Sequence, residues 1–211
     1  MPKHSTRKHA RLVTVLLGLT VTHCGDDDKS SAVTVSTGLP SAQKLSAFDD
    51  EDAKAACEAL NDGATEIISD AELIRSQCSS LAIRRTAKVN SAQTQITLDI
   101  AKCETAAREC ETTPVTYGIT AEGGREESDC DDATANQQVR ACEATVSEYE
   151  ACVSKILGQA KQTLANISCA NGKALLESDG AEARLDPQRF AECKLFLDKC
   201  PDVRITATVT E

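Results

Sequence analysis

The sequence predicts an all-α protein, a disulfide-stapled helical bundle with two packed helical groups behind a flexible N-terminal tether. Three observations favour this fold class. Apolar residues recur with the 3.6-residue period of amphipathic helices through most of the chain. Bulky core residues are scarce, with three phenylalanines, two tyrosines and no tryptophan among 211 residues. There are 11 cysteines, and those in the periodic segments lie on the apolar faces, so bridges between helices are expected to replace part of a bulky core.

The N-terminal segment has the layout of an export signal. Four basic residues and no acidic residue precede a mostly apolar run at residues 12–21. This run is shorter than the roughly 20 residues that a membrane-spanning helix needs, and a basic region followed by an apolar region is typical of a secretory signal. Residues 1–23 are therefore predicted to be a signal peptide.

The apolar run ends in Val21-Thr22-His23-Cys24, which resembles the lipobox of bacterial lipoproteins. In that motif an aliphatic residue, a small residue and Gly, Ala or Ser precede the lipidated cysteine, and His23 departs from the pattern. The resemblance implies an acylated Cys24 as the first residue of the mature chain, anchored to a membrane by its lipid. An aspartate directly after the cysteine retains enteric lipoproteins in the inner membrane. Gly25 occupies that position, which favours the outer membrane or the cell surface. The alternative is an ordinary thiol after an ordinary signal peptide.

The remainder of the chain divides into five segments. Residues 24–43 are rich in Ser, Thr, Asp and Gly without helical periodicity, and are predicted to form a flexible tether. A first helical group at 44–113 and a second at 129–202 are separated by a linker loop at 114–128, which contains one proline and three glycines. The tail at 203–211 alternates apolar and polar residues as a strand does.

Helices are predicted within both groups. The clearest begins at Thr145, where Thr145 and Glu148 form a capping box and an apolar stripe continues to Ile167. Another begins with Asp186 as its cap and Pro187 at its first position, and ends before Pro201. The other predicted helices lie at about 46–60, 69–87, 91–111 and 132–144.

The cysteine count supports both the lipid and the bridges. If Cys24 is acylated, ten cysteines remain and all can pair, as exported chains do in an oxidising compartment. No Cys-x-x-Cys pair occurs, so no structural zinc, thioredoxin-like or haem site is predicted, and no metal. The expected disulfide cysteines are Cys57, Cys78, Cys103, Cys110, Cys130, Cys142, Cys152, Cys169, Cys193 and Cys200.

Geometry predicts two of the five pairs. If the helices at about 69–87 and 91–111 form an antiparallel hairpin that reverses between them, Cys78 lies opposite Cys103. A preceding helix that turns at Asn61-Asp62-Gly63 would bring Cys57 to Cys110. The pairing of the other six cysteines stays open.

Composition disfavours several function classes. All three histidines lie within residues 1–23, so the mature chain has no imidazole for a Ser-His-Asp or Cys-His nucleophile. Removal of the four N-terminal basic residues leaves 19 basic against 33 acidic residues, a net charge of −14. Such a charge repels phosphate backbones, so no nucleic acid is expected as a partner. No catalytic residue and no cofactor are predicted.

Three polar motifs have simpler explanations than a site. The acidic run at 49–52 lacks the ligand pattern of an EF-hand and is typical of a helix N-terminus. Asp129, Asp131 and Asp132 offer a carboxylate pair as in glycosidases, but the scarcity of aromatic residues argues against a sugar cleft. The sequon at 166–168 is interpreted as a coincidence.

The sequence therefore predicts a membrane-anchored, cysteine-rich lipoprotein that acts as a non-enzymatic binding, scaffold or envelope-interaction module with an unknown protein or envelope partner. Two alternatives stay open. They are a hydrolase that uses carboxylates, and a soluble secreted disulfide-rich inhibitor or toxin.

Overall fold

The computed structural model describes residues 14–15, 33–90, 95–121, 130–131, 133–177, 186–203 and 206–207. Within these residues the protein is mostly helical and is held by five disulfides, which confirms the predicted fold class. The α-helices are α1 (Asp50–Ile67), α2 (Asp70–Thr86), α3 (Ile100–Thr112), α4 (Ala133–Arg140), α5 (Val146–Asn166), α6 (Gly172–Glu177) and α7 (Ala191–Lys199). The 3-10 turns are η1 (Leu45–Ala47), η2 (Pro114–Tyr117) and η4 (Pro187–Arg189).

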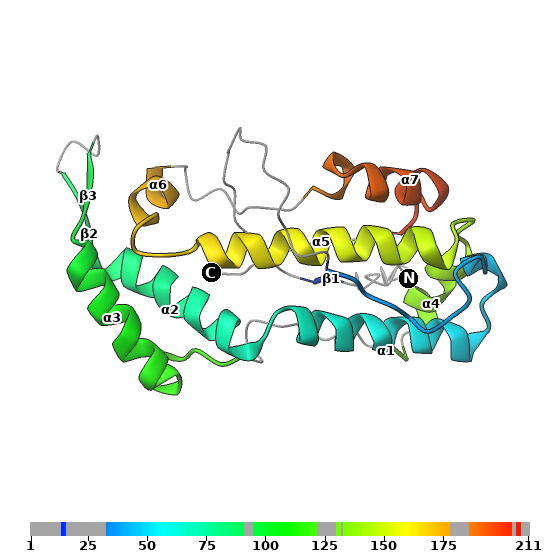
Figure 1. Cartoon of the computed structure of the whole chain (residues 1–211), viewed down its shortest axis with the longest axis horizontal. Coiled ribbons are helices and arrows are strands. Elements are labelled where there is room, and N and C mark those ends of the chain that lie inside the picture. Colours follow the sequence, from blue (N-terminus) through cyan, green and yellow to red (C-terminus); the bar gives the residue numbers. More distant parts are fainter. Residues whose placement is uncertain are drawn as a thin grey trace, which may run out of the picture.

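Helix α5 is the central element. Figure 1 shows it along the middle of the molecule, with α1 and α2 following one another on one side and α6 and α7 on the other. The predicted capping box begins α5, because the Thr145 side chain accepts from the N–H of Glu148 while the Glu148 carboxylate accepts from the N–H of Thr145. The apolar face of α5 is buried, including Ile156, Leu157 and Ala160.

Helices α1 and α2 meet at a fixed corner. A second capping box, between Ser69 and Glu72, starts α2 immediately after Ile68 ends α1. Lys161 of α5 donates its ammonium to the carbonyl oxygen of Ile67 at 2.9 Å and lies 3.4 Å from the Glu72 carboxylate. These contacts attach the corner to the central helix.

Helices α2 and α3 form the predicted antiparallel hairpin, but a short β-ribbon extends its turn. Strand β2 (Ala87–Val89) pairs antiparallel with β3 (Ile96–Leu98), and Ala87 lies opposite Leu98. The N–H of Asn90 donates to the carbonyl oxygen of Gln95 at 3.1 Å. The prediction of a helix over 91–111 is therefore wrong at its start, because α3 begins at Ile100 with Asp99 as its cap.

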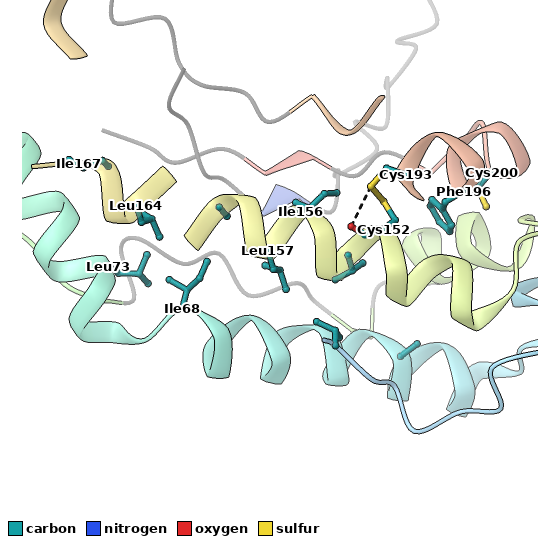
Figure 2. Close-up of a cluster of buried hydrophobic side chains, with 14 of the residues drawn as sticks. Ile68, Leu73, Cys152, Ile156, Leu157, Leu164, Ile167, Cys193, Phe196 and Cys200 are labelled. Atoms are coloured by element: carbon teal, nitrogen blue, oxygen red, sulfur yellow. Dashed lines mark hydrogen bonds between the residues drawn. A yellow bond between two sulfur atoms is a disulfide. The ribbon is translucent and has the colours of Figure 1, made fainter. Parts of the chain in front are cut away.

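One continuous core joins the two predicted helical groups. It contains buried side chains of α1, α2 and α3 together with those of α5 and α7. Figure 2 shows Leu157 and Leu164 of α5 directed toward Ile68 and Leu73 at the α1–α2 corner. Phe196 of α7, only 1% exposed, covers the other side of α5.

The linker predicted at 114–128 forms a 3-10 turn and buries one side chain over its described part. After α3 the chain forms η2 and turns at Gly118, whose positive φ of 74° suits glycine. Ile119 then lies in a second small core cluster with Cys78 and Cys110. The Arg85 guanidinium stands 5.1 Å from the ring centroid of Tyr117, which closes the edge of this cluster. Residues 122–129 lie outside the described residues.

The C-terminal helix begins later than predicted, because Asp186 caps only a short 3-10 turn and the extended backbone of Phe190 separates this turn from α7. Asp186 accepts from the N–H of Gln188, and Pro187 begins η4, after which α7 runs from Ala191 to Lys199. Strand β4 (Thr206–Ala207), within the tail predicted to be strand-like, pairs in parallel with β1 (Thr14–Val15).

Helix α6 packs against β3 at Gly172, where an added Cβ would stand 2.6 Å from Leu98.

Candidate functional site

The N-terminal segment that leads to Cys24 is the candidate site. Cys24 and the rest of the lipobox-like motif lie outside the described residues. Residues 33–39, here named the strap, run along the folded body between α1 and α5 (Figure 1). The strap therefore connects the predicted anchor to the helices.

The strap is extended and alternates between inward and outward side chains. Val35 is 3% exposed, Val33 and Thr37 are partly buried, and Thr34 and Ser36 between them are exposed. This is the two-residue period of a strand with one face covered.

Two side chains of α5 bond the backbone of the strap. The N–H of Val35 donates to the Ser154 hydroxyl at 2.8 Å. The N–H of Thr37 donates to Glu150 Oε1 at 2.6 Å, and the Thr37 hydroxyl donates to the same oxygen at 2.9 Å. A hydrogen bond to a charged acceptor contributes about 1.5–3 kcal/mol, so Glu150 is the strongest single attachment.

Two helix glycines make room for the valines of the strap. An added Cβ at Gly63 of α1 would lie 3.2 Å from both methyl carbons of Val35, closer than most real contacts. An added Cβ at Gly158 of α5 would lie 3.6 Å from the Cβ of Val33, an ordinary contact distance. The strap therefore fits closely at Gly63 and more loosely at Gly158.

The residues after the strap are fastened through the backbone. The N–H of Val146 donates to the carbonyl oxygen of Gln43, and the N–H of Leu45 donates to that of Ala144, each at 2.9 Å. The Lys44 ammonium lies 2.7 Å from the Glu143 carboxylate. These bonds connect the chain before α1 to the start of α5.

The prediction of a flexible tether to residue 43 is therefore wrong for residues 33–43, which are hydrogen-bonded to α5 and to the residues before it. This segment is polar in composition and lacks helical periodicity, a pattern that is typical of a segment without regular structure. Period-2 alternation of Val33, Val35 and Thr37 was the signal that could have identified a docked strand.

All ten cysteines from Cys57 onward are paired. Four of the five bridges are buried, and the fifth, between Cys57 and Cys130, is partly exposed. The bridges, with their Cα–Cα distances, are Cys57–Cys130 (5.5 Å), Cys78–Cys110 (5.5 Å), Cys103–Cys169 (5.8 Å), Cys142–Cys200 (4.6 Å) and Cys152–Cys193 (4.4 Å). Two of them, Cys57–Cys130 and Cys103–Cys169, join the two helical groups.

The predicted pair Cys78–Cys103 is wrong because the β-ribbon moves the hairpin turn. The prediction placed the reversal at about residues 88–91, whereas the ribbon centres it between Asn90 and Gln95. Residues of α3 that are further along the chain therefore face α2, and Cys78 meets Cys110.

The predicted pair Cys57–Cys110 is wrong for a different reason. The chain does not reverse at Asn61-Asp62-Gly63, because α1 continues through this triplet to Ile67. Gly63 makes room for Val35 there and does not form a turn. Cys57 consequently forms its disulfide with Cys130 and not with Cys110.

Several carboxylates stabilise the helices as anions. The Lys199 ammonium lowers the pKa of Glu148, and the Lys44 ammonium lowers the pKa of Glu143. Backbone N–H donors at helix starts lower the pKa of Glu72 and of Asp99. These four groups are ionised at neutral pH and act in caps and ion pairs.

The acidic residues at 49–52 and Asp131 also act in a helix cap, hydrogen bonds and ion pairs. Asp49 caps α1 by accepting from the N–H of Asp52 at 2.9 Å, and Asp52 accepts from the Gln43 amide at 2.8 Å. Asp50 lies 2.8 Å from the Arg140 guanidinium. Asp131 accepts from the Lys54 ammonium at 2.9 Å, while Asp129 and Asp132 lie outside the described residues.

The described residues contain neither a metal-binding cluster nor a membrane-spanning helix. No group of three or more His, Cys, Asp or Glu side chains in these ranges is placed to hold a metal ion. None of the helices in the described part of the chain is both long and apolar enough to cross a bilayer. The sequon residue Asn166 is the last residue of α5, and its carbonyl oxygen accepts from the Asn171 amide at 3.1 Å.

No protein-family model matches this chain, and no curated protein or solved structure is significantly similar to it.

Proposed function

We propose that this protein is a lipoprotein of the bacterial cell envelope, anchored to a membrane through a lipid on Cys24, whose folded body is a non-enzymatic binding or scaffold module. Cysteine pairing is the observation that carries the proposal. The chain has 11 cysteines, and the ten from Cys57 to Cys200 pair with one another. Cys24 is thus left without a cysteine partner in the chain, as acylation requires. The lipobox-like residues before it supply the second, independent support.

The character of the body supports a module that presents a surface. Five bridges and one continuous core hold the helices, so recognition would involve little rearrangement. The mature chain would carry a net charge of −14 and no histidine, which favours a protein or another envelope component as partner over nucleic acid and disfavours imidazole catalysis.

Acylation is tested by metabolic labelling with a fatty acid in a bacterial host. The wild type is expected to carry the label and to sediment with membranes, and Cys24→Ser is expected to lose both properties. The double variant Cys57→Ser/Cys130→Ser is the matched control, since it removes two cysteines and should keep the label. A wild-type protein that is soluble and unlabelled would overturn the proposal.

The membrane that carries the protein is identified by separating inner and outer membranes. Because Gly25 follows Cys24, the wild type is expected in the outer-membrane fraction or at the cell surface, and Gly25→Asp should move it to the inner membrane. Thr34→Asp adds the same charge at an exposed strap position and should not change the fraction. Crosslinking in intact cells with the native anchor in place would then identify the partner.

A further inference from the structure

The strap and the residues that follow it are held by different kinds of bond. Residues 41–45 exchange backbone hydrogen bonds with the residues at the start of α5. In the described part of the chain, the strap is bonded to the body only through the side chains of Ser154 and Glu150. Gly38, with φ of 73°, lies near the end of the strap, and Pro40, which has no N–H to bond, follows the strap directly. Release of the strap would therefore break none of the backbone bonds at 41–45.

We propose that residues 33–39 are a releasable strap that sets how far the folded body can stand from the membrane. This inference rests on the proposed lipid anchor at Cys24. When the strap is docked, the chain leaves the body at Val33, nine residue steps from Cys24. When the strap is released, the chain leaves the body at the fastening near Ser41, 17 steps from Cys24.

Chain geometry gives the size of the effect. Nine residue steps from Cys24 to Val33 reach at most about 30 Å, and 17 steps from Cys24 to Ser41 reach at most about 60 Å, at about 3.4 Å per step. Release therefore roughly doubles the maximum distance that the chain can span between the lipid and the body.

Substitutions on the strap can free it or lock it. Val35→Asp places a charge in the buried position between α1 and α5 and should free the strap. Thr34→Asp adds the same charge at the neighbouring exposed position and is the matched control. Val33→Cys/Gly158→Cys should lock it, because the two Cβ atoms would lie 3.6 Å apart, within the range of a disulfide.

Docking is measured by hydrogen exchange on the full acylated chain in vesicles of phosphatidylethanolamine and phosphatidylglycerol. The Thr37 amide is expected to exchange at least about tenfold faster in Val35→Asp than in the wild type, while α5 amides and the Thr34→Asp control stay unchanged. Ser154→Ala, which removes one acceptor without adding a charge, should give a smaller increase and serves if Val35→Asp misfolds. Equal exchange of the Thr37 amide in all variants would show that the strap is not docked.

The distance between the folded body and the membrane is measured by energy transfer from a single tryptophan to dansyl-labelled lipid in the same vesicles. The chain has no tryptophan, so Leu195→Trp, at a position 61% exposed on α7, supplies one donor. Transfer should be lower in the freed variant than in the wild type and not lower in the locked variant. Equal transfer in freed and locked chains would overturn the strap as a spacer. A chain that is not acylated and does not stay on vesicles would refute the lipid anchor instead, and the exchange result would still decide docking.

Discussion

The two bridges that join the helical groups allow burial and loop length to be separated as sources of disulfide stability. Cys103–Cys169 and Cys57–Cys130 span similar sequence separations, 66 and 73 residues. They differ in environment, since Cys103 is 0% and Cys169 5% exposed, whereas Cys57 and Cys130 are partly exposed. We compare the double alanine variants, Cys103→Ala/Cys169→Ala and Cys57→Ala/Cys130→Ala.

The loop-closure contribution is similar for both bridges. For Cys103–Cys169 the chain-entropy relation gives about 4.4 kcal/mol. The Cys78–Cys110 bridge lies inside the other loop and shortens it in the unfolded chain to about 42 residues, which gives about 3.9 kcal/mol. The difference of about 0.4 kcal/mol is small beside the effect of burial.

Burial adds a cost only to the inner bridge. Replacing each buried sulfur by hydrogen removes about as much apolar contact as one methylene, about 0.8 kcal/mol, and the close-packed surroundings recover little of it. The inner variant should therefore lose about 5–6 kcal/mol and the outer one about 4 kcal/mol. Urea unfolding followed by far-UV circular dichroism, with the other four bridges intact, measures both values. An outer variant that is destabilised as much as the inner one would refute the reasoning.

Three further predictions follow from the described contacts. The pKa of Glu148 is lowered chiefly by Lys199. The ionised Glu148 therefore contributes its full stabilisation above the unfolded pKa of about 4.3, and this contribution is lost as the pH falls below that value. Glu148→Gln should flatten the acid side of a curve of unfolding free energy against pH. Desolvation of the partly buried Tyr149 raises its pKa to about 12, so the unfolded chain releases this proton first. The free energy of unfolding should therefore fall between about pH 10 and pH 12 in the wild type and fall less in Tyr149→Phe. Gly172→Ala should cost about 1–3 kcal/mol because its Cβ would overlap aliphatic side chains, whereas Gly158→Ala has room and should stabilise α5 by up to about 1 kcal/mol, both measured by thermal unfolding.

Helix starts with side-chain caps could be predicted closely from the sequence. Thr145 with Glu148 marks the start of α5, and both side chains act as predicted. Asp186 also caps the turn that leads to α7. Capping depends on residues within one turn of each other, so a local pattern carries the information. The Cys24 anchor stays a prediction, because its support is the motif and the cysteine count.

The strap and the ribbon could not be predicted in the same way because their partners are distant in the sequence. Val35 is placed by Ser154, 119 residues away, and by Gly63 on another helix. The ribbon residue Ile96 also fits the helical stripe of Ile100 and Cys103, and its pairing with Val89 decides against the helix. Short apolar segments are ambiguous between helix and strand until a partner is known.

Helical periodicity determines the face of the helix on which a cysteine lies, but not the cysteine with which it pairs. Cys103 and Cys110 are seven residues apart, close to two full turns, so both lie on the same face of α3 and are separated by about 10 Å along its axis. The apolar stripe therefore predicts that both point inward, which they do, and it does not distinguish which of them faces Cys78. That choice depends on where the hairpin turns, and the ribbon places the turn so that Cys110 takes this position. Cys103 is thereby left to bridge Cys169, which follows α5, and the short ribbon decides whether the two helical groups are covalently joined at this point.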